Sequence, residues 1–130
     1  MAIAAMALRA QQARMRIIAE NIANSQTTAS TPGGDPYRRQ APVFTPLKME
    51  GGATSVRMSG VQADPKPFKS EYSPGHPAAD ASGYVKLPNV DSLVEALDLK
   101  AAQRAYEANL NVIDTSHAME KSTLDLLNKP

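Results

Sequence analysis

The positions of glycine and proline constrain the fold of this 130-residue chain more than any other feature of its sequence. All seven glycines and nine of the ten prolines lie within residues 32–88, and the tenth proline is the last residue. Both residue types disfavour the interior of a helix, so only the flanking segments 1–31 and 89–130 are suited to long helices. The pattern predicts a mainly α protein: an N-terminal helix, a Pro/Gly-rich insert with short β-strands, and a longer C-terminal helix.

Each flanking segment carries an apolar stripe whose members recur at spacings of three and four residues. In the first segment the stripe is Ala4, Leu8, Gln11, Met15, Ile18 and Ile22. In the second it is Val90, Val94, Leu97, Ala101, Ala105, Ala108, Val112, Thr115, Met119 and Leu126. Such spacing is typical of helices that pair along a narrow seam. We therefore predict that the two helices pair as an antiparallel coiled coil. The expected contacts join Leu8, Met15, Ile18 and Ile22 to Val94, Leu97, Ala101, Ala108, Val112 and Met119.

Charge supports this pairing, but the pair is not expected to be self-sufficient. Residues 1–24 carry three arginines and one glutamate, a net charge of +2, whereas residues 91–129 carry four basic and seven acidic residues, a net charge of −3. A lone helix with one narrow stripe is marginal in water, because most helix stability comes from packing. The sequence therefore predicts a subunit whose folding is coupled to assembly, and whose purified monomer shows weak helical circular dichroism at low concentration.

The insert is expected to hold a small β element of its own. Residues 36–44 and 54–62 predict two strands, the second by its alternating pattern, and residues 66–72 predict a third. Residues 74–83, rich in proline and glycine, predict a loop. Five of the six aromatic residues lie in the insert, so we expect it to have a minor core.

Composition and motifs argue against an enzyme. The net charge of +1 and the absence of cysteine give no basis for a nucleic-acid partner or a thiolate metal site. No phosphate-binding loop, dinucleotide, zinc or nucleophile motif is present. We interpret His76 as a solvated loop residue, with a metal site or dyad formed with Asp80 as the less favoured alternative, and His117 as an exposed helical residue. We expect no cofactor, metal or small-molecule substrate.

The N-terminal helix allows two further interpretations. Arg9, Arg14 and Arg16 could form a nucleic-acid surface, but no aromatic residue is interleaved with them, so a solvated face is favoured. Residues 1–22 could lie on a membrane, but their stripe is narrow and lacks tryptophan and phenylalanine, so helix packing is favoured. The apolar start, residues 1–8, is too short to span a membrane and has no basic residues before it, so no conventional targeting signal is expected.

Three segments together resemble one family, the axial proteins of the bacterial flagellum. The stretch "AENIANSQTTASTPGGDPYRRQ" (19–40) is similar to the N-terminal signature of this family, and "RAYEANLNVIDTSHAMEKSTLDLL" (104–127) is similar to its C-terminal signature. The stretch "YSPGHPAADASGYVKLPNVD" (72–91) is more specific, because it resembles a run found in the proximal-rod members of the family. The resemblance covers most of the chain.

The resemblance implies a structural subunit of the proximal rod, part of the drive shaft that transmits motor torque. Such subunits are exported without a cleaved signal peptide and assemble in the periplasm through their terminal helices. The implied partners are copies of the chain, other rod subunits, the distal rod and the inner-membrane ring or export gate region. A soluble two-helix adaptor or a secretion chaperone of a type III system is the alternative. Family members commonly have more residues before the stretch "ALRAQ" (7–11), so we expect a late start or a trimmed N-terminus.

Asparagines near the end of the first helix are the most unusual candidate assembly residues. Asn24 is suited to a left-handed helix cap, and both Asn21 and Asn24 are suited to polar register contacts between helices. We expect their partners on the last helix, at Asn109 and Asn111. At the junction of the insert with the last helix, the expected contact residues are Tyr37, Tyr84, Val85, Pro88 and Asn89.

Overall fold

The computed structural model describes residues 2–128, and it shows two long helices separated by a small β insert. In chain order the elements are α1 (Ala2–Ala23), β1 (Gln40–Lys48), β2 (Thr54–Ala63), β3 (Lys69–Tyr72), β4 (Tyr84–Leu87) and α2 (Ser92–Leu127). The prediction of a mainly α chain with a small β insert is confirmed. Neither helix of the described part is long and apolar enough to cross a membrane.

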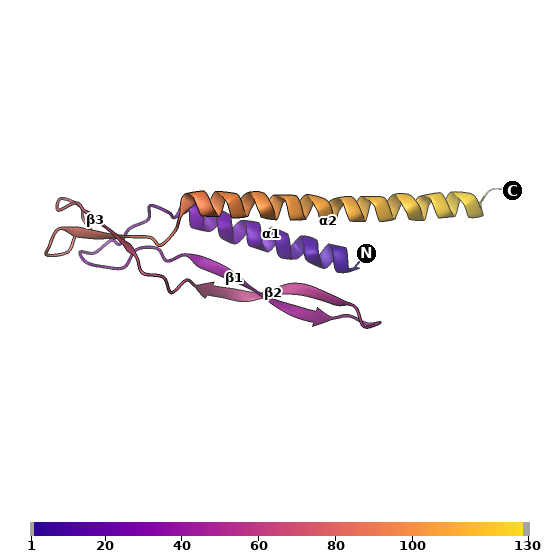
Figure 1. Cartoon of the computed structure of the whole chain (residues 1–130), viewed down its shortest axis with the longest axis horizontal. Coiled ribbons are helices and arrows are strands. Elements are labelled where there is room, and N and C mark those ends of the chain that lie inside the picture. The colour runs from indigo at the N-terminus through magenta and orange to yellow at the C-terminus, as the bar shows by residue number, and fades with distance from the viewer. Residues whose placement is uncertain (1, 129–130) are drawn as a thin grey trace.

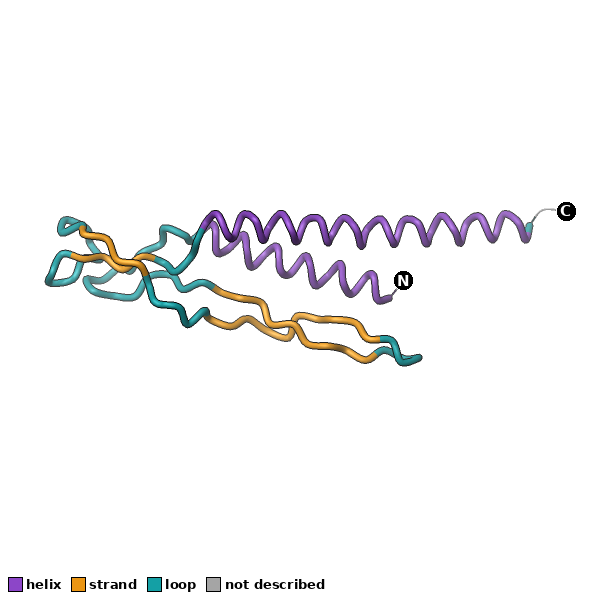
Figure 2. Tube along the Cα trace, viewed as in Figure 1, coloured by secondary structure: helices purple, strands orange, loops and turns teal. Residues whose placement is uncertain are grey.

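The elements are arranged along one axis, as Figure 1 shows. Helix α1 runs towards the insert and α2 runs away from it, and the two helices lie side by side in contact. The β1–β2 hairpin also packs on α1, which therefore lies between α2 and the hairpin. The smaller β3–β4 sheet lies beyond the point where the helices meet the insert (Figure 2). The buried apolar residues lie partly on α1 and partly in the insert and just before α2, where they include Ala78, Val85 and Val90.

The insert forms two separate two-stranded antiparallel sheets. Strand β1 contains Pro42 and Pro46, which is tolerated because each strand of a two-stranded sheet has one free edge. At the hairpin turn Gly51 and Gly52 both adopt positive φ angles, 88° and 85°, which glycine reaches without steric cost. The pairing β3–β4 brings Tyr84–Leu87 into a strand that the sequence analysis did not predict. A four-residue strand is too short for periodicity to reveal.

Helix α2 begins with a side-chain cap and extends far beyond α1. The Asp91 carboxylate accepts hydrogen bonds from the backbone N–H groups of Leu93 (3.0 Å) and Val94 (3.4 Å). With 36 residues, α2 is about 54 Å long, whereas the 22 residues of α1 span about 33 Å. The last fourteen residues of α2, about 21 Å of helix, therefore have no counterpart in α1. Figure 1 shows this overhang beyond the N-terminal end of α1.

The face of α2 that is buried differs from the predicted one by one residue. The predicted contact residues Val94, Leu97, Ala101, Ala108, Val112 and Met119 are all exposed in the single chain. The buried positions are Glu95 and Ala102, and the half-buried ones continue along the same face through Ala105, Asn109 and Ile113. The predicted packing of α1 on the first set is therefore wrong within one chain. The hydrophobic pattern does not reveal the buried face, because that face begins with a charged residue, Glu95.

Helix α1 is covered on two sides rather than one. Its buried residues are Ala10, Ile17, Ile18 and Asn21. Of the predicted seam, Ile18 is buried and Leu8, Met15 and Ile22 are half-buried. The row Ala10, Ile17 and Asn21 lies roughly a third of a turn round the helix from the centre of that seam. The hairpin contacts this second row, which explains why it is buried although the sequence pattern omits it.

Candidate functional site

The side chain of Asn21 is 0% exposed and makes three hydrogen bonds. Its Nδ2 donates to the backbone carbonyl of Gln40 (2.8 Å), and its Oδ1 accepts from the backbone N–H of Gln40 (2.9 Å). The same Oδ1 also accepts from the Tyr37 hydroxyl (2.7 Å). The amide thus pairs with a backbone peptide as a neighbouring strand would, and it joins the end of α1 to the start of β1.

A buried ion pair joins the insert to the first turn of α2. The Glu95 side chain is 1% exposed and accepts a hydrogen bond at Oε1 from Arg39 Nε. Arg39 Nη1 also contacts Asp64 Oδ2 at 3.3 Å, so one guanidinium binds carboxylates from two parts of the chain. Glu95 Oε2 has no hydrogen-bond partner among the described residues. A buried charge is tolerated only when it is paired, so Arg39 determines that this face of α2 is buried.

Asn89 connects the same cluster to the segment before α2. Its Oδ1 accepts from the backbone N–H of Arg39 (2.7 Å), and its Nδ2 donates to the carbonyls of Asp64 (3.1 Å) and Lys66 (3.0 Å). Arg38 Nη1 donates to the same two carbonyls, at 2.6 and 3.0 Å. The Arg38 guanidinium also lies 4.1 Å from the centre of the Phe68 ring. We call the cluster of Asn21, Tyr37, Arg39, Asp64, Asn89 and Glu95 the junction.

The charges at the junction shift its pKa values in consistent directions. Burial raises the pKa of the Tyr37 hydroxyl, and the negative charges of Glu20 and Glu95 raise it further. Burial alone would lower the pKa of Arg39, but its hydrogen bond to Glu95 and the charges of both carboxylates raise it. The backbone N–H of Lys66 lowers the pKa of Asp64, and Arg39 lowers it further. The junction thus has the charged Arg39 between the carboxylates of Asp64 and Glu95, and the neutral Tyr37 hydroxyl lies at its edge.

The other contact residues predicted for this part of the chain are Tyr84, Val85 and Pro88. Val85 is 1% exposed and Pro88 is fully buried, while Tyr84 is exposed and packs edge-on against Tyr72 with ring centres 5.3 Å apart. Gly83 precedes Tyr84 with φ at 85°, and a Cβ added there would come within 2.8 Å of the Tyr72 ring. Glycine is required at this turn for both reasons.

The predicted asparagine contacts between the helices are wrong within one chain. Asn21 is paired with Gln40 and Tyr37 of the insert, not with α2. Asn24 donates to the carbonyl of Glu20 (2.8 Å) and does not form a left-handed cap, since no non-glycine residue among residues 2–128 has positive φ. Asn109 donates to Ala105 of its own helix (2.9 Å), and Asn111 is exposed. An asparagine amide in a helix can donate to the carbonyl one turn before it, which also accepts a backbone hydrogen bond, and sequence spacing does not reveal this.

The two histidines have ordinary surroundings. His76 Nδ1 accepts from the backbone N–H of Ala78 (3.0 Å), and Asp80 Oδ1 accepts from the N–H groups of Ser82 and Tyr84. Both side chains therefore stabilise turns. His117 is exposed on α2. Within residues 2–128, no group of three or more histidine, aspartate or glutamate side chains is placed to hold a metal ion.

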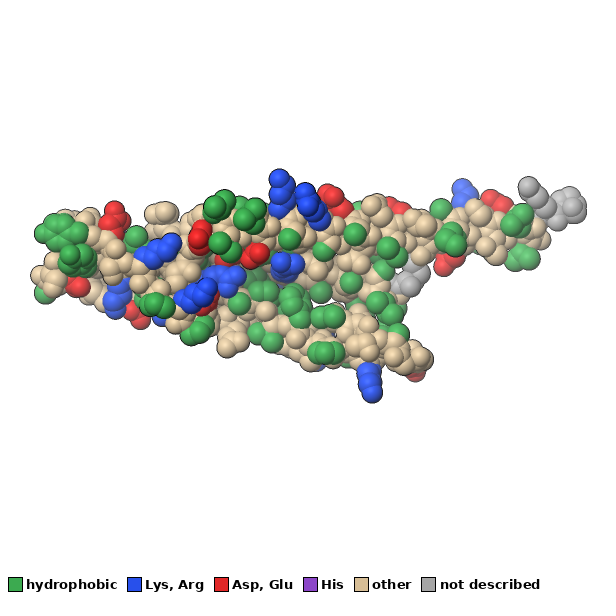
Figure 3. All heavy atoms as spheres, in the orientation of Figure 1, with side chains coloured by type: hydrophobic (Ala, Val, Ile, Leu, Met, Phe, Trp, Pro, Cys, Tyr) green, Lys and Arg blue, Asp and Glu red, His purple; other side chains and the backbone are tan. Residues whose placement is uncertain are grey.

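An apolar surface along α2 is the second notable feature. It comprises the exposed residues Val94, Leu97, Val112, Met119 and Leu126, which share one face of the helix. The exposed fraction of these side chains lies between 47% at Val94 and 70% at Leu126. Figure 3 shows hydrophobic side chains spread along the whole of α2. An apolar surface of this extent marks a contact with another molecule.

Comparison with known proteins shows the family to which this chain belongs. Residues 81–126 match the family described as flagellar basal body rod FlgEFG protein C-terminal. The chain is 45% identical over 126 residues to the flagellar basal-body rod protein FlgC of Agrobacterium fabrum, covering 96% of this chain and 91% of that protein. The chain belongs to the FlgC family of flagellar basal-body rod proteins. It is 42% identical to the FlgC of Salmonella typhimurium, over 95% of this chain and 92% of the relative. The FlgC of Bacillus subtilis is 34% identical, over 95% and 93% respectively.

Membership of the FlgC family confirms the prediction of a structural subunit of the flagellar basal-body rod, and the protein is not an enzyme. The sequence analysis missed Arg39, Asp64 and Glu95, which lie at the centre of the junction. One signal was present in the sequence: the segment that contains Asn89 belongs to the most specific part of the resemblance. No pattern of spacing links residues 39, 64 and 95.

Proposed function

We propose that this FlgC-family subunit occupies the proximal rod and assembles through its terminal helices, so that it forms part of the shaft that transmits motor torque. The exposed apolar surface of α2 carries this proposal. Within one chain α1 covers only the Glu95–Ala102 face, so the neighbouring face with Leu97 and Val112 is available to other subunits. The Asn21 and Glu95 contacts hold α1, α2 and the insert in fixed relation, which torque transmission requires.

The finer elements of the proposal follow from the same arrangement. We infer that α1 and α2 form an antiparallel coiled-coil pair within the subunit, and that the insert 32–88 sets the azimuthal register against adjacent rod proteins. The partners are copies of this chain and other rod subunits. At the ends of the proximal rod, they are the inner-membrane ring or export gate region and the distal rod. The subunit is assembled in the periplasm after export without a cleaved signal peptide.

Substitution of the exposed surface tests the proposal directly. Leu97→Ser combined with Val112→Ser removes two exposed apolar side chains without touching the junction. We expect cells carrying this variant to lose swimming motility, and the protein to be absent from isolated basal bodies. The matched control is Lys100→Ser with Glu107→Ser, which changes two exposed polar residues of the same helix. Normal motility of the first variant would contradict the proposed use of this surface.

Fractionation separates the proposal from the adaptor alternative. A rod subunit co-purifies with intact basal bodies, whereas a soluble adaptor or secretion chaperone stays in the cytoplasm. We expect the wild-type chain in the basal-body fraction, in fixed ratio to other rod proteins. Recovery only from the cytoplasm would contradict the proposal.

A further inference from the structure

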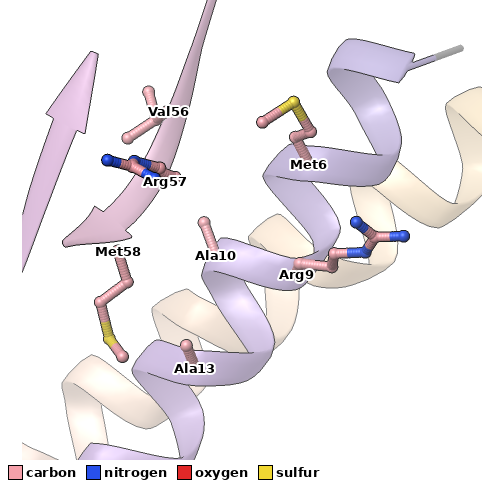
Figure 4. Close-up of a pocket in the computed structure, with 7 residues that line it drawn as sticks. All are labelled: Met6, Arg9, Ala10, Ala13, Val56, Arg57 and Met58. Carbon is pink, nitrogen blue, oxygen red and sulfur yellow. The ribbon is translucent and has the colours of Figure 1, made fainter. Parts of the chain in front are cut away.

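A groove opens between the first half of α1 and strand β2. It has a volume of about 300 Å³. It is lined by Met6, Arg9, Ala10, Ala13, Val56, Arg57 and Met58. Figure 4 shows Met6 and Met58 beside the two alanines of α1, with Arg9 on the helix side and Arg57 on the strand side. The groove therefore has an apolar floor and a positively charged residue on each of its two walls.

The shape of the groove fits a helix. Its α1 residues are Met6, Arg9, Ala10 and Ala13, which follow one face of the helix over two turns, so the groove runs along the helix axis. The small side chains of Ala10 and Ala13 leave room for protruding side chains at the floor. An apolar face of a helix laid into such a groove is a recurrent mode of recognition.

The overhang of α2, residues 114–127, has the complementary properties. Met119 and Leu126 lie seven residues apart on one face and are 66% and 70% exposed. Asp114 and Asp125 lie on one side of this apolar strip, and Glu120 lies on the other. Lys121 is the one lysine or arginine of the overhang, so the three acids leave a net charge of −2.

The walls of the groove carry the opposite charge. The part of α1 that lines it has no acidic residue, since the first acid of the chain is Glu20, and β2 has none. Arg9 and Arg57 are both exposed, so they are free to meet acids that flank an incoming helix. Charge complementarity of this kind selects the partner and its register more than it adds affinity.

We propose that the overhang of α2 from a second copy of this chain docks in the groove between α1 and β2. The contact joins two different surfaces, so each copy offers one groove and one overhang to its neighbours. In a pair joined by one such head-to-tail contact, one groove and one overhang stay free, so the contact can propagate from copy to copy. The inference rests on the proposed function, because it names the partner and the surfaces through which this rod subunit associates with itself.

Charge reversal of each surface tests the proposal with the full-length chain. One variant carries Arg9→Glu and Arg57→Glu, and the other carries Glu120→Lys and Asp125→Lys. Each variant alone brings like charges together, and we expect its self-association, measured by analytical ultracentrifugation, to weaken at least tenfold. In an equimolar mixture every groove meets an oppositely charged overhang, so we expect association to return towards the wild-type level. Equal association of wild type and variants, or a mixture no better than its components, would overturn the proposal.

Two controls keep the test specific. The pair Arg16→Glu and Glu107→Lys reverses one exposed charge on each helix outside the two surfaces, and we expect it to leave association unchanged. Circular dichroism of every variant verifies that the helices are retained. This pair leaves the net charge unchanged, so a matching loss of association would mean that charges elsewhere on the helices, not those of the groove, govern assembly, and the proposal would fail.

Cross-linking identifies the occupant in cells. The chain has no cysteine, so Met58→Cys and Met119→Cys each introduce a single thiol. When the two variants are co-expressed, we expect a thiol cross-linker to join one to the other, and we expect no such product from Met58→Cys with Ala96→Cys. Cross-linking of Met119→Cys only to a different rod protein would overturn the second-copy assignment while leaving the rod function intact. Absence of the chain from basal bodies would instead count against the rod function.

Discussion

A charged residue is buried at one end of α2 and apolar residues are exposed at the other, which is the reverse of the usual pattern of burial. In its first turn a carboxylate, Glu95, is 1% exposed, whereas near its end Met119 and Leu126 are 66% and 70% exposed. The charged residue is inside because the insert supplies Arg39 to neutralise it. The apolar residues are outside because they continue the stripe of Leu97 and Val112, which α1 does not cover. The difference shows that the start of α2 finds its contacts within the chain, whereas the end of α2 requires contacts with a neighbouring molecule.

Removal of the buried carboxylate should have the largest effect on the free energy of unfolding. Glu95→Ala leaves the Arg39 guanidinium without its main partner, and breaking a buried ion pair costs about 3–4 kcal/mol. The measurement is guanidinium unfolding of the purified chain followed by circular dichroism. Glu107→Ala, at an exposed site of the same helix, should change the free energy by less than about 0.5 kcal/mol. Equal effects of the two substitutions would remove the contrast between the two ends of α2.

The next largest effect is expected at the end of α1. Asn21→Ala leaves both backbone groups of Gln40 and the Tyr37 hydroxyl without their partner, at a cost of about 2–3 kcal/mol. Asn111→Ala, at an exposed position of α2, should be nearly neutral. Thermal unfolding of both variants provides the measurement. If Asn111→Ala proves the more damaging, then the polar contacts between the helices matter more than the junction.

Substituting leucine for two adjacent alanines of α2 tests which face of this helix packs against α1. Ala102 is 0% exposed, so Ala102→Leu overpacks the contact and should cost about 1–2 kcal/mol. Ala101 is exposed, and Ala101→Leu should leave the free energy of unfolding almost unchanged. Denaturant unfolding of the two variants distinguishes the faces. The opposite order would support the packing predicted from the hydrophobic stripe.

The smallest effect is a dependence of stability on acid pH. The folded pKa of Asp64 lies below its unfolded value of about 3.9, so its stabilisation is present above that pH and is lost as the pH falls through the lowered folded value. Asp64→Asn should therefore flatten the acid limb of the stability profile between about pH 5 and pH 2. Asp125→Asn on the overhang should leave that limb unchanged. An identical acid limb in wild type and Asp64→Asn would show that other carboxylates determine it.

The sequence was sufficient to predict the two helices and the insert, because Pro and Gly exclude long helices from residues 32–88. It was not sufficient to predict which face of α2 is buried. That face has Glu95 at its start, and its burial depends on Arg39, 56 residues away in the chain. A pattern of apolar residues records only local periodicity, so it selected the adjacent stripe with Leu97 and Val112.

The asparagines show the same limit on a smaller scale. The asparagines correctly indicated that the end of α1 has unusual polar contacts. The partner of Asn21 is the backbone of Gln40, and a backbone group has no sequence signature. A buried amide can pair with a peptide of any residue, so the sequence predicts the need for a partner but not its location. The groove between α1 and β2 was likewise beyond prediction, because it depends on how the hairpin is placed.

The separation of Arg39 from Glu95 also has a consequence for how the chain folds in time. A contact between residues 56 positions apart forms slowly, because a long loop must close before the contact stabilises anything. A nascent chain that ends before residue 95 has α1 and the hairpin but no α2 to cover the other side of α1. Such an incomplete chain remains open until its last third is present. Under the proposed export, a contact that forms this late leaves α1 without its α2 cover until most of the chain is present.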